Sequence, residues 1–232
     1  RASFAQVGND MDAYQLYNTY SIGSDPNGNT TAGQGKTKYD ADVRSELITS
    51  WEAGAELKFF NNRLGVDFAW YKTNAKRQLM NIPLNNLSGY DNMKVNAGNI
   101  QNTGIEIMLN ARPIETAQFS WDTQLNFSQN KSKIIELLPG KPGMQYALGG
   151  SDALQVYAVA GGAYGEIWGT KYQRVEEGEF KGQLLLNESG LPQATSDKHK
   201  IGEQQPDFLL GWTNTFNYKN FTLSFLIDGR FG

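Results

Sequence analysis

Apolar and polar residues alternate along residues 104–128, which is the pattern of β-strands with two unlike faces. The apolar positions before a short link are Ile105, Ile107, Leu109 and Ala111, and those after it are Phe119, Trp121, Leu125 and Phe127. Two such strands predict a β-hairpin. With Arg112 opposite Gln118, Leu109 faces Trp121 and Ile105 faces Leu125, so the apolar residues of both strands share one face.

Two further pairs of segments show the same construction. The first turns at Asn61-Asn62, and a two-residue loop there places Leu57 opposite Val66. The second turns at Lys219-Asn220, which places Tyr218 opposite Phe221. In each hairpin the apolar residues again share one face.

The remaining segments have weaker patterns. Residues 14–22 form a weak strand candidate, and residues 23–42 are rich in Gly, Asn, Thr and Asp, which predicts a loop. Residues 74–103 and 131–206 are expected to be long connections, the second with a small hairpin of 167–172 against 180–186. All seven prolines lie outside the strands expected here, as a ladder of N–H donors requires.

Short and long connections therefore alternate along the chain, at two residues, about thirty, five, about seventy-five and two. An up-and-down barrel in an outer membrane has this asymmetry, with tight turns on the inner side and long loops outside. We expect an all-β fold of antiparallel hairpins, a partial segment of a large transmembrane β-barrel. Residues 1–232 would form one barrel segment, cut at both ends, in which residues 131–206 are an extracellular excursion.

Two alternatives share the alternating pattern, namely a soluble β-sandwich and a lipocalin-like barrel. Such folds bury their apolar face in a shared core, and their loops are commonly short at both ends. The asymmetry of loop lengths therefore favours the membrane barrel. Leu57, Val66, Ile107 and Leu125 are the test residues, since a dry core between two sheets would enclose them.

On the opposite face, which we expect to line a wet lumen, the charged residues are Glu52, Glu56, Lys58, Asp67, Glu106, Asp122, Asp228 and Arg230. The expected register sets Glu56 opposite Asp67, a repulsive pair unless water, Lys58 or a plug residue intervenes. Apolar Leu209 and Leu226 fall on this polar face. Asn214 falls on the apolar face, where a bulge or a subunit contact would account for it.

Composition excludes several functions. The chain has 232 residues and a formal net charge of −3, so nothing in its charge indicates a nucleic-acid partner. Without cysteine it has no disulfide, thiolate metal site or cysteine nucleophile. His199 is the only histidine, and we expect no catalytic residue, no metal and no cofactor. Residues 25–29 resemble a calcium loop but lack its closing acidic residue, which favours a solvated turn.

Several stretches resemble, in order, the C-terminal barrel half of SusC/RagA-type TonB-linked outer-membrane transporters. The most recognisable is Val95-Asn-Ala-Gly-Asn-Ile-Gln-Asn-Thr-Gly-Ile-Glu106. The others include Arg1 to Asp10, Phe59 to Gly65, Tyr164 to Gly169 and Phe221 to Arg230. The resemblance covers nearly the whole chain.

This resemblance implies a barrel of about 22 strands, closed by an N-terminal plug that lies outside this chain. It implies import of a glycan or peptide nutrient across the outer membrane of a Gram-negative cell. The implied partners are TonB, which acts through the absent plug region, a SusD-like surface lipoprotein that acts as a lid, and outer-membrane lipid.

Candidate nutrient contacts lie in the expected outer loops. The flat rings of Tyr90, Tyr164, Trp168 and Tyr172 suit sugar rings or peptide side chains, with Asn92 and Asp152 as hydrogen-bond partners. These aromatics could instead pack the loops against one another. Two other functions stay open, a surface carbohydrate-binding β-domain without transport and, less favoured, a β-sandwich hydrolase.

Overall fold

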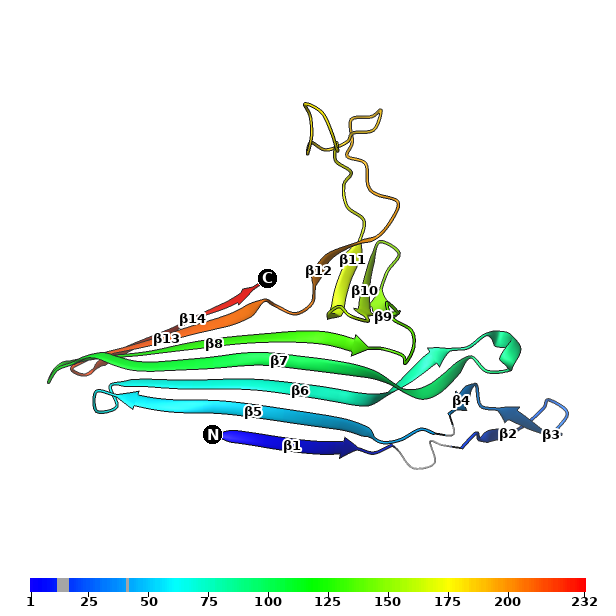
Figure 1. The fold of residues 1–232 in the computed structure, drawn as a ribbon, viewed down its shortest axis with the longest axis horizontal. Helices are drawn as coiled ribbons and strands as arrows, with labels where there is room; N and C mark the ends of the chain where they lie inside the picture. The colour runs from blue at the N-terminus through cyan, green and yellow to red at the C-terminus, as the bar shows by residue number, and fades with distance from the viewer. Residues whose placement is uncertain (12–16, 41) are drawn as a thin grey trace.

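One sheet of long strands forms a curved wall (Figure 1). The computed structural model describes residues 1–11, 17–40 and 42–232. In spatial order the wall contains β1 (Ala2–Asn9), β5 (Glu46–Phe59), β6 (Leu64–Pro83), β7 (Asn92–Glu115), β8 (Phe119–Glu136), β13 (Phe208–Tyr218) and β14 (Phe221–Phe231). All neighbours in this series are antiparallel, which confirms the expected fold class.

The first and last expected hairpins form in the predicted registers. Leu57 pairs with Val66 across the Asn61-Asn62 turn, and Tyr218 pairs with Phe221 across the Lys219-Asn220 turn. Asn61 and Asn62 both have positive φ, at 53° and 66°. Asparagine tolerates this region of backbone conformation better than most residues, so the sequence suits this tight turn.

The middle hairpin forms four residues out of the predicted register. Leu109 pairs with Leu125 rather than Trp121, because β7 continues past Arg112 to Glu115 and turns at residues 116–118. A bulge between Ala111 and Ile114 contains Pro113, so the expectation that no proline lies in these strands was wrong. A shift of four keeps every side chain on its face, and the shared apolar face survives.

The wall strands are much longer than predicted. Residues 74–103 were expected to be a connection, but β6 and β7 remain paired as far as Pro83 and Asn92, leaving residues 84–91 as the link. β7 has 24 residues and reaches about 80 Å at about 3.3 Å per residue. An apolar band of roughly 25 Å covers only part of such a strand, so the polar upper half extends beyond the lipid.

The N-terminal region is more ordered than its composition indicated. β2 (Tyr20–Ser24) and β3 (Thr30–Gln34) form a hairpin, and β4 (Thr37–Tyr39) pairs parallel to β7. Residues 23–42 are therefore not simply a loop, and residues 14–16 of the weak strand candidate lie outside the described part. The short 3₁₀ helix η1 (Asn86–Ser88) precedes β7. None of the described residues belongs to a helix long and apolar enough to cross a membrane.

The excursion between β8 and β13 contains a second sheet, called here the loop sheet. Its order is β12 (His199–Glu203), β11 (Tyr164–Gly169), β10 (Leu154–Val159) and β9 (Gln145–Gly150). The predicted hairpin of 167–172 against 180–186 was wrong, because β11 pairs with β10 and β12. Residues 170–198 instead form an extended arm, which projects beyond the loop sheet in Figure 1 and is linked by isolated bridges such as Arg174 to Leu184.

The loop sheet covers the polar face at one end of the wall. Ile134 continues the alternation of Ser128, Asn130 and Ser132 on that face, and it is fully buried with Leu137 and Ala158. The turn between β10 and β11 bonds to the β8 backbone, where Gly161 N donates to Ile134 O at 2.7 Å. The tight turns gather at the opposite end of the wall (Figure 1).

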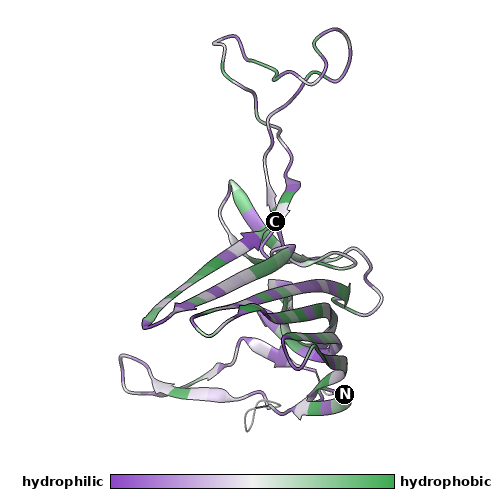
Figure 2. Ribbon diagram, turned by 90° about the vertical axis from the view of Figure 1, so that its left-hand side faces the viewer, coloured by the Kyte–Doolittle hydropathy of each residue, from purple (hydrophilic) through white to green (hydrophobic). Residues whose placement is uncertain are grey.

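The apolar face of the wall is not enclosed by a second sheet. Leu57 is 51% exposed and Leu223 62% exposed, while Val66, Ile107 and Leu125 are half-buried by neighbours in the same sheet. Figure 2 shows the alternation of hydrophobic and hydrophilic residues along the wall strands. A sandwich would bury these side chains between two layers, so this arrangement agrees with a lipid-facing surface.

Asn214 lies on the apolar face, as expected, but β13 has no bulge at this position. β13 keeps an unbroken register with β8 and β14 at this position. The side chain is 1% exposed, and its Oδ1 accepts a hydrogen bond from Trp121 Nε1 at 3.0 Å. Trp212 Nε1 likewise donates to Thr123 Oγ1 at 2.8 Å. Aromatic neighbours therefore shield these polar atoms from the surroundings of the wall.

The two faces of β8 predict opposite responses to a charge. We expect Leu125→Arg, on the apolar face, to destabilise the full-length protein in a bilayer by about 2–4 kcal/mol. Gln124→Arg on the polar face is the matched control and should cost far less. Unfolding free energies measured after refolding into lipid vesicles test this, and equal costs for the two variants would contradict the assignment of faces.

Candidate functional site

The polar face of the wall neutralises most of its own charges. Glu56 lies opposite Asp67, as predicted. Lys58 Nζ approaches Glu56 at 2.8 Å, and Arg1 Nη2 approaches Asp67 at 3.0 Å. The expected repulsion is therefore relieved by cations of the wall itself, of which Lys58 was foreseen and Arg1 was not.

Three of the apolar side chains on the polar face line one groove. Met108, Leu209 and Leu226 contribute to a groove of about 440 Å³, bordered by Asp67 and Asp228. Leu209 and Leu226 were expected on this face, and the pairing of the strands brings them together with Met108 of β7. The groove is a site where an apolar surface could pack against an otherwise polar wall.

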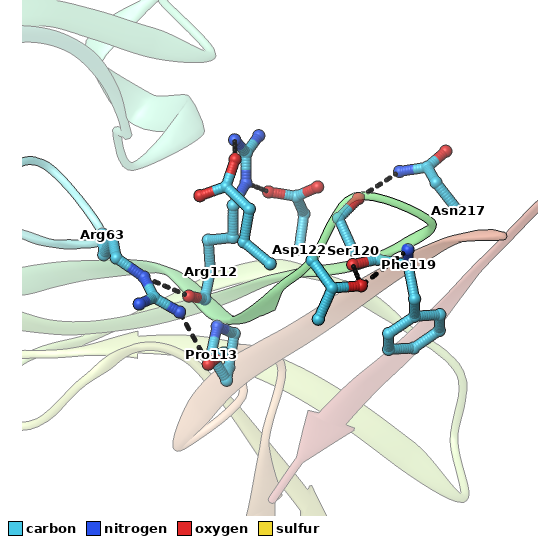
Figure 3. A network of polar contacts seen from close by, with 9 residues as sticks. Arg63, Arg112, Pro113, Phe119, Ser120, Asp122 and Asn217 are labelled. Carbon is cyan, nitrogen blue, oxygen red and sulfur yellow. Dashed lines mark hydrogen bonds and ion pairs between the residues drawn. The ribbon is translucent and has the colours of Figure 1, made fainter. Parts of the chain in front are cut away.

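A polar network fixes the wall at its tight-turn end (Figure 3). Arg63 donates to the carbonyl oxygens of Arg112 and Pro113, at 3.2 and 2.9 Å. Arg112 donates in turn to Asp122 at 2.6 Å and to Glu115 at 3.1 Å. The bulge at Pro113 is thus bonded to the neighbouring turn, and these side chains have a structural role.

Tyr164, one of the predicted nutrient contacts, lies in a groove at the opposite end of the wall. This loop-end groove, of about 370 Å³, lies between β6, β7 and the loop sheet, and its lining includes Met80, Lys94, Tyr146, Leu148 and Tyr164. Met80 and Tyr146 pack against the buried cluster around Ile134. Tyr164 is 40% exposed, so its ring is accessible at the edge of the groove.

Trp168 bonds to a buried carboxylate and does not line that groove. Its Nε1 donates to Glu166 at 3.0 Å, and Lys200 Nζ donates to the same carboxylate at 3.1 Å. Glu166 is 5% exposed. Burial alone would raise the pKa of Glu166, but the hydrogen bonds from Lys200, Trp168 and the Ala163 amide together lower it below its usual value.

The other predicted contact residues are scattered. Tyr90 accepts a hydrogen bond from Gln34 of β3 at 2.5 Å, and Asn92 is the first residue of β7. Asp152 is exposed in the turn between β9 and β10. Tyr172 is exposed at the base of the arm, where it pairs with Ala194. These four residues do not form one constellation with Tyr164.

The turn at residues 25–29 satisfies its own carboxylate. Asp25 accepts hydrogen bonds from the backbone amides of Asn27 and Asn29 and from the Asn29 side chain, at 2.8 to 3.0 Å. The Asn29 bonds are the main reason that the pKa of Asp25 is lowered. Within the described residues, no group of three or more acidic or histidine side chains could hold a metal.

Tyr146, Glu166 and Lys200 were missed as site residues. Tyr164, Glu166 and Trp168 alternate along β11, and this period would have placed Glu166 beside the tryptophan. No local sequence pattern indicates the neighbours of Tyr146 or Lys200, because the order of the strands in the loop sheet determines these neighbours.

Comparisons with known proteins agree with this geometry. A family model described as TonB dependent receptor-like, beta-barrel, matches residues 1–227. The chain belongs to this family. SusC of Bacteroides thetaiotaomicron, a TonB-dependent receptor, is 29% identical over 235 residues, covering 94% of this chain and 23% of SusC. TonB-dependent receptor P3 of Formosa agariphila is 28% identical over 207 residues, covering 82% of this chain and 21% of P3.

The fold resembles that of solved SusC/RagA-type structures. The RagAB peptide transporter matches with a TM-score of 0.74 at 18% identity, over 98% of this chain and 26% of that chain. The chain thus spans about a quarter or less of the length of these relatives, which explains a wall that does not close into a barrel. The segment is part of an outer-membrane protein of a Gram-negative bacterium.

The Glu166 network predicts a pH-dependent loop sheet. The pKa of Glu166 is lowered in the folded state from its unfolded value of 4.5. The ionised carboxylate therefore stabilises the folded loop sheet fully above pH 4.5, and this stabilisation is lost as the pH falls below 4.5. We expect Glu166→Gln to weaken the loop sheet by about 1–3 kcal/mol at neutral pH. Hydrogen exchange of the β11 amides in the full-length protein, corrected for intrinsic rates, measures this effect.

Glu188→Gln is the control for this variant, since Glu188 lies exposed on the arm. At every pH, the corrected exchange rates of the β11 amides in this variant should equal those of the wild type. Exchange in Glu166→Gln that matches the wild type at neutral pH would show that the carboxylate does not hold the loop sheet.

Proposed function

We propose that this segment is wall and outer loops of a TonB-dependent importer that carries a glycan or peptide nutrient across the outer membrane. One observation carries the proposal: the wall exposes a continuous apolar face on one side and a polar, self-neutralised face on the other. A barrel closed from such strands would be embedded in lipid and would enclose a wet lumen. Family membership supports the same conclusion.

The proposed partners act at opposite ends of the wall. TonB would act from the tight-turn side through a plug that lies outside this chain. A SusD-like lipoprotein would cover the long-loop side, where residues 131–206 would be extracellular. The projection of the arm and loop sheet at that end supports this orientation (Figure 1). The groove of Met108, Leu209 and Leu226 gives the plug an apolar surface to pack on.

Nutrient contacts would come from the outer loops. Tyr164 has the strongest support, because it borders the loop-end groove. Tyr90, Asn92, Asp152 and Tyr172 would act separately from it, and Trp168 would mainly hold Glu166 in place. We propose no catalytic residue, since the named relatives are receptors and transporters rather than enzymes.

Uptake by intact cells tests the proposed function. Cells that lack the full-length gene should fail to accumulate at least one labelled component of a mixture of casein peptides and starch oligosaccharides. Restoring the gene should restore accumulation, and a protonophore should stop it, because import of this kind draws on inner-membrane energy.

Two results would separate this function from its alternative. Gene-dependent binding at the cell surface that resists the protonophore and leads to no accumulation would indicate a carbohydrate-binding domain without transport. Accumulation that is unchanged by loss of the gene would contradict import altogether. Leu125→Arg, which should impair membrane insertion, serves as a negative control for restoration.

A further inference from the structure

We propose that the arm holds a subsite for an anionic glycan. The site is a groove of about 550 Å³, called here the arm groove, whose lining includes Lys171, Tyr172, Arg174, Glu176, Lys181 and His199. This inference rests on the proposed function and narrows the nutrient to a sugar that carries carboxylate or sulfate groups. The arm projects beyond the loop sheet (Figure 1), at the long-loop end of the wall where a nutrient would arrive first.

The arm groove gathers positive charge on a chain that is acidic overall. Its permanent cations are Lys171, Arg174 and Lys181. Glu176 is the one carboxylate among the described residues of the lining, so the groove has a formal charge of +2 with His199 neutral. The whole chain has a formal charge of −3. Several cations around one groove attract an anionic ligand more strongly than isolated surface charges do.

Neighbouring side chains do not neutralise these three cations. In the described part of the chain none of them forms an ion pair, and Glu176 pairs with none of them. The Arg174 guanidinium donates to the Gly182 carbonyl oxygen at 2.6 Å. On the wall, by contrast, Lys58 and Arg1 already bind carboxylates. An anionic ligand in the arm groove would therefore displace no carboxylate of the described chain.

Backbone hydrogen bonds hold the cation-bearing segments together. Val175 N donates to Gln183 O at 2.9 Å, and Gly182 N donates back to Val175 O at 2.8 Å. Residues 171–175 and 181–183 are therefore fixed side by side. Because the backbone is already ordered, a ligand that spans the two segments would incur little further cost of ordering the protein.

The exposed aromatic ring of the groove favours a sugar over a peptide side chain. Tyr172 is 62% exposed, so the groove is shallow around its ring. An apolar side chain binds through full burial, which a shallow surface does not provide. A sugar ring can lay its C–H face on the tyrosine ring while its hydroxyl groups stay in water or bond to polar side chains.

The rest of the lining suits a ligand that is apolar on one side and charged on another. Val175 is the one aliphatic side chain in the described lining. The remaining apolar surface belongs to rings and to the stems of polar side chains, which end in charged or hydrogen-bonding groups. Tyr172 was predicted from the sequence as a nutrient contact, and the arrangement of the arm places the cations around it.

Binding of defined probes tests the subsite. The full-length protein is extracted in mild detergent with any bound lipoprotein retained. Calorimetry compares tetragalacturonate with its methyl ester, which keeps the sugar rings and removes their charge. At low ionic strength the acid should bind about tenfold more tightly than the ester, equivalent to about 1.4 kcal/mol. At high ionic strength this preference should fall to about threefold or less, because dissolved ions screen the attraction.

Variants tie this preference to the arm groove. Lys171→Gln and Lys181→Gln should each reduce the preference for the acid to about threefold or less at low ionic strength. Lys141→Gln removes an exposed cation outside the groove and should keep the preference. Tyr172→Ala should weaken binding of the acid about fivefold, and Tyr172→Phe, which keeps the ring, should not. Heat-modifiable gel migration confirms that each variant is folded.

Two further probes separate the ligand classes. A chondroitin sulfate tetrasaccharide carries both carboxylate and sulfate, and it should bind at least as tightly as tetragalacturonate. The peptide Glu-Gly-Glu-Gly-Glu should bind about tenfold more weakly or less tightly still. Peptide binding that is as tight as that of tetragalacturonate and is lost in Lys181→Gln would make the groove an acidic-peptide site and would overturn the glycan subsite.

Three other results would also overturn the subsite: equal affinity for the acid and the ester at low ionic strength, no binding of either anionic saccharide, or a preference that survives both lysine variants. The uptake assay, with labelled tetragalacturonate added to the mixture, separates these failures from a failure of the proposed function. Gene-dependent, protonophore-sensitive uptake of any component leaves the proposed function intact. Uptake that is independent of the gene for every component would contradict the proposed function itself.

Discussion

The structure depends on pairing every wall strand with its neighbours. In lipid a backbone N–H or C=O without a partner costs several kcal/mol, so strands can cross only as a continuous ladder. Six consecutive antiparallel pairings, from β1–β5 to β13–β14, meet this requirement within the segment. The outer edges of β1 and β14 would need further strands, consistent with a chain that spans only part of its relatives.

The same pairing extends above the membrane and positions the outer surfaces. β6, β7 and β8 continue as strands beyond the lipid band, and their upper ends support the loop sheet. Ile134 marks the point where the polar face becomes a small hydrophobic core. Because Met80 and Tyr146 pack on that core, the loop-end groove is anchored to the wall as well as to the loop sheet.

Sequence alone predicted what depended on local periodicity. The Asn61-Asn62 and Lys219-Asn220 turns set their registers correctly, since a two-residue loop leaves little freedom. In the middle hairpin, β7 continues through the Pro113 bulge beyond the expected turn. The strand segments above the lipid are polar in sequence, so they were expected to be loops. Tyr164, a predicted nutrient contact, lines the loop-end groove together with Tyr146 of β9 and Met80 of β6. No local sequence pattern could indicate that these three residues line one groove.

The central claim is that the two faces of the wall meet different solvents. The most direct test places a spin label, through single cysteines, at successive positions 119–128 of the full-length protein in bilayers, with any native cysteine replaced. The account predicts that odd positions are accessible to oxygen dissolved in the lipid and that even positions are accessible to a water-soluble nickel chelate. Odd positions that are shielded from both reagents, as in a dry core, would contradict it.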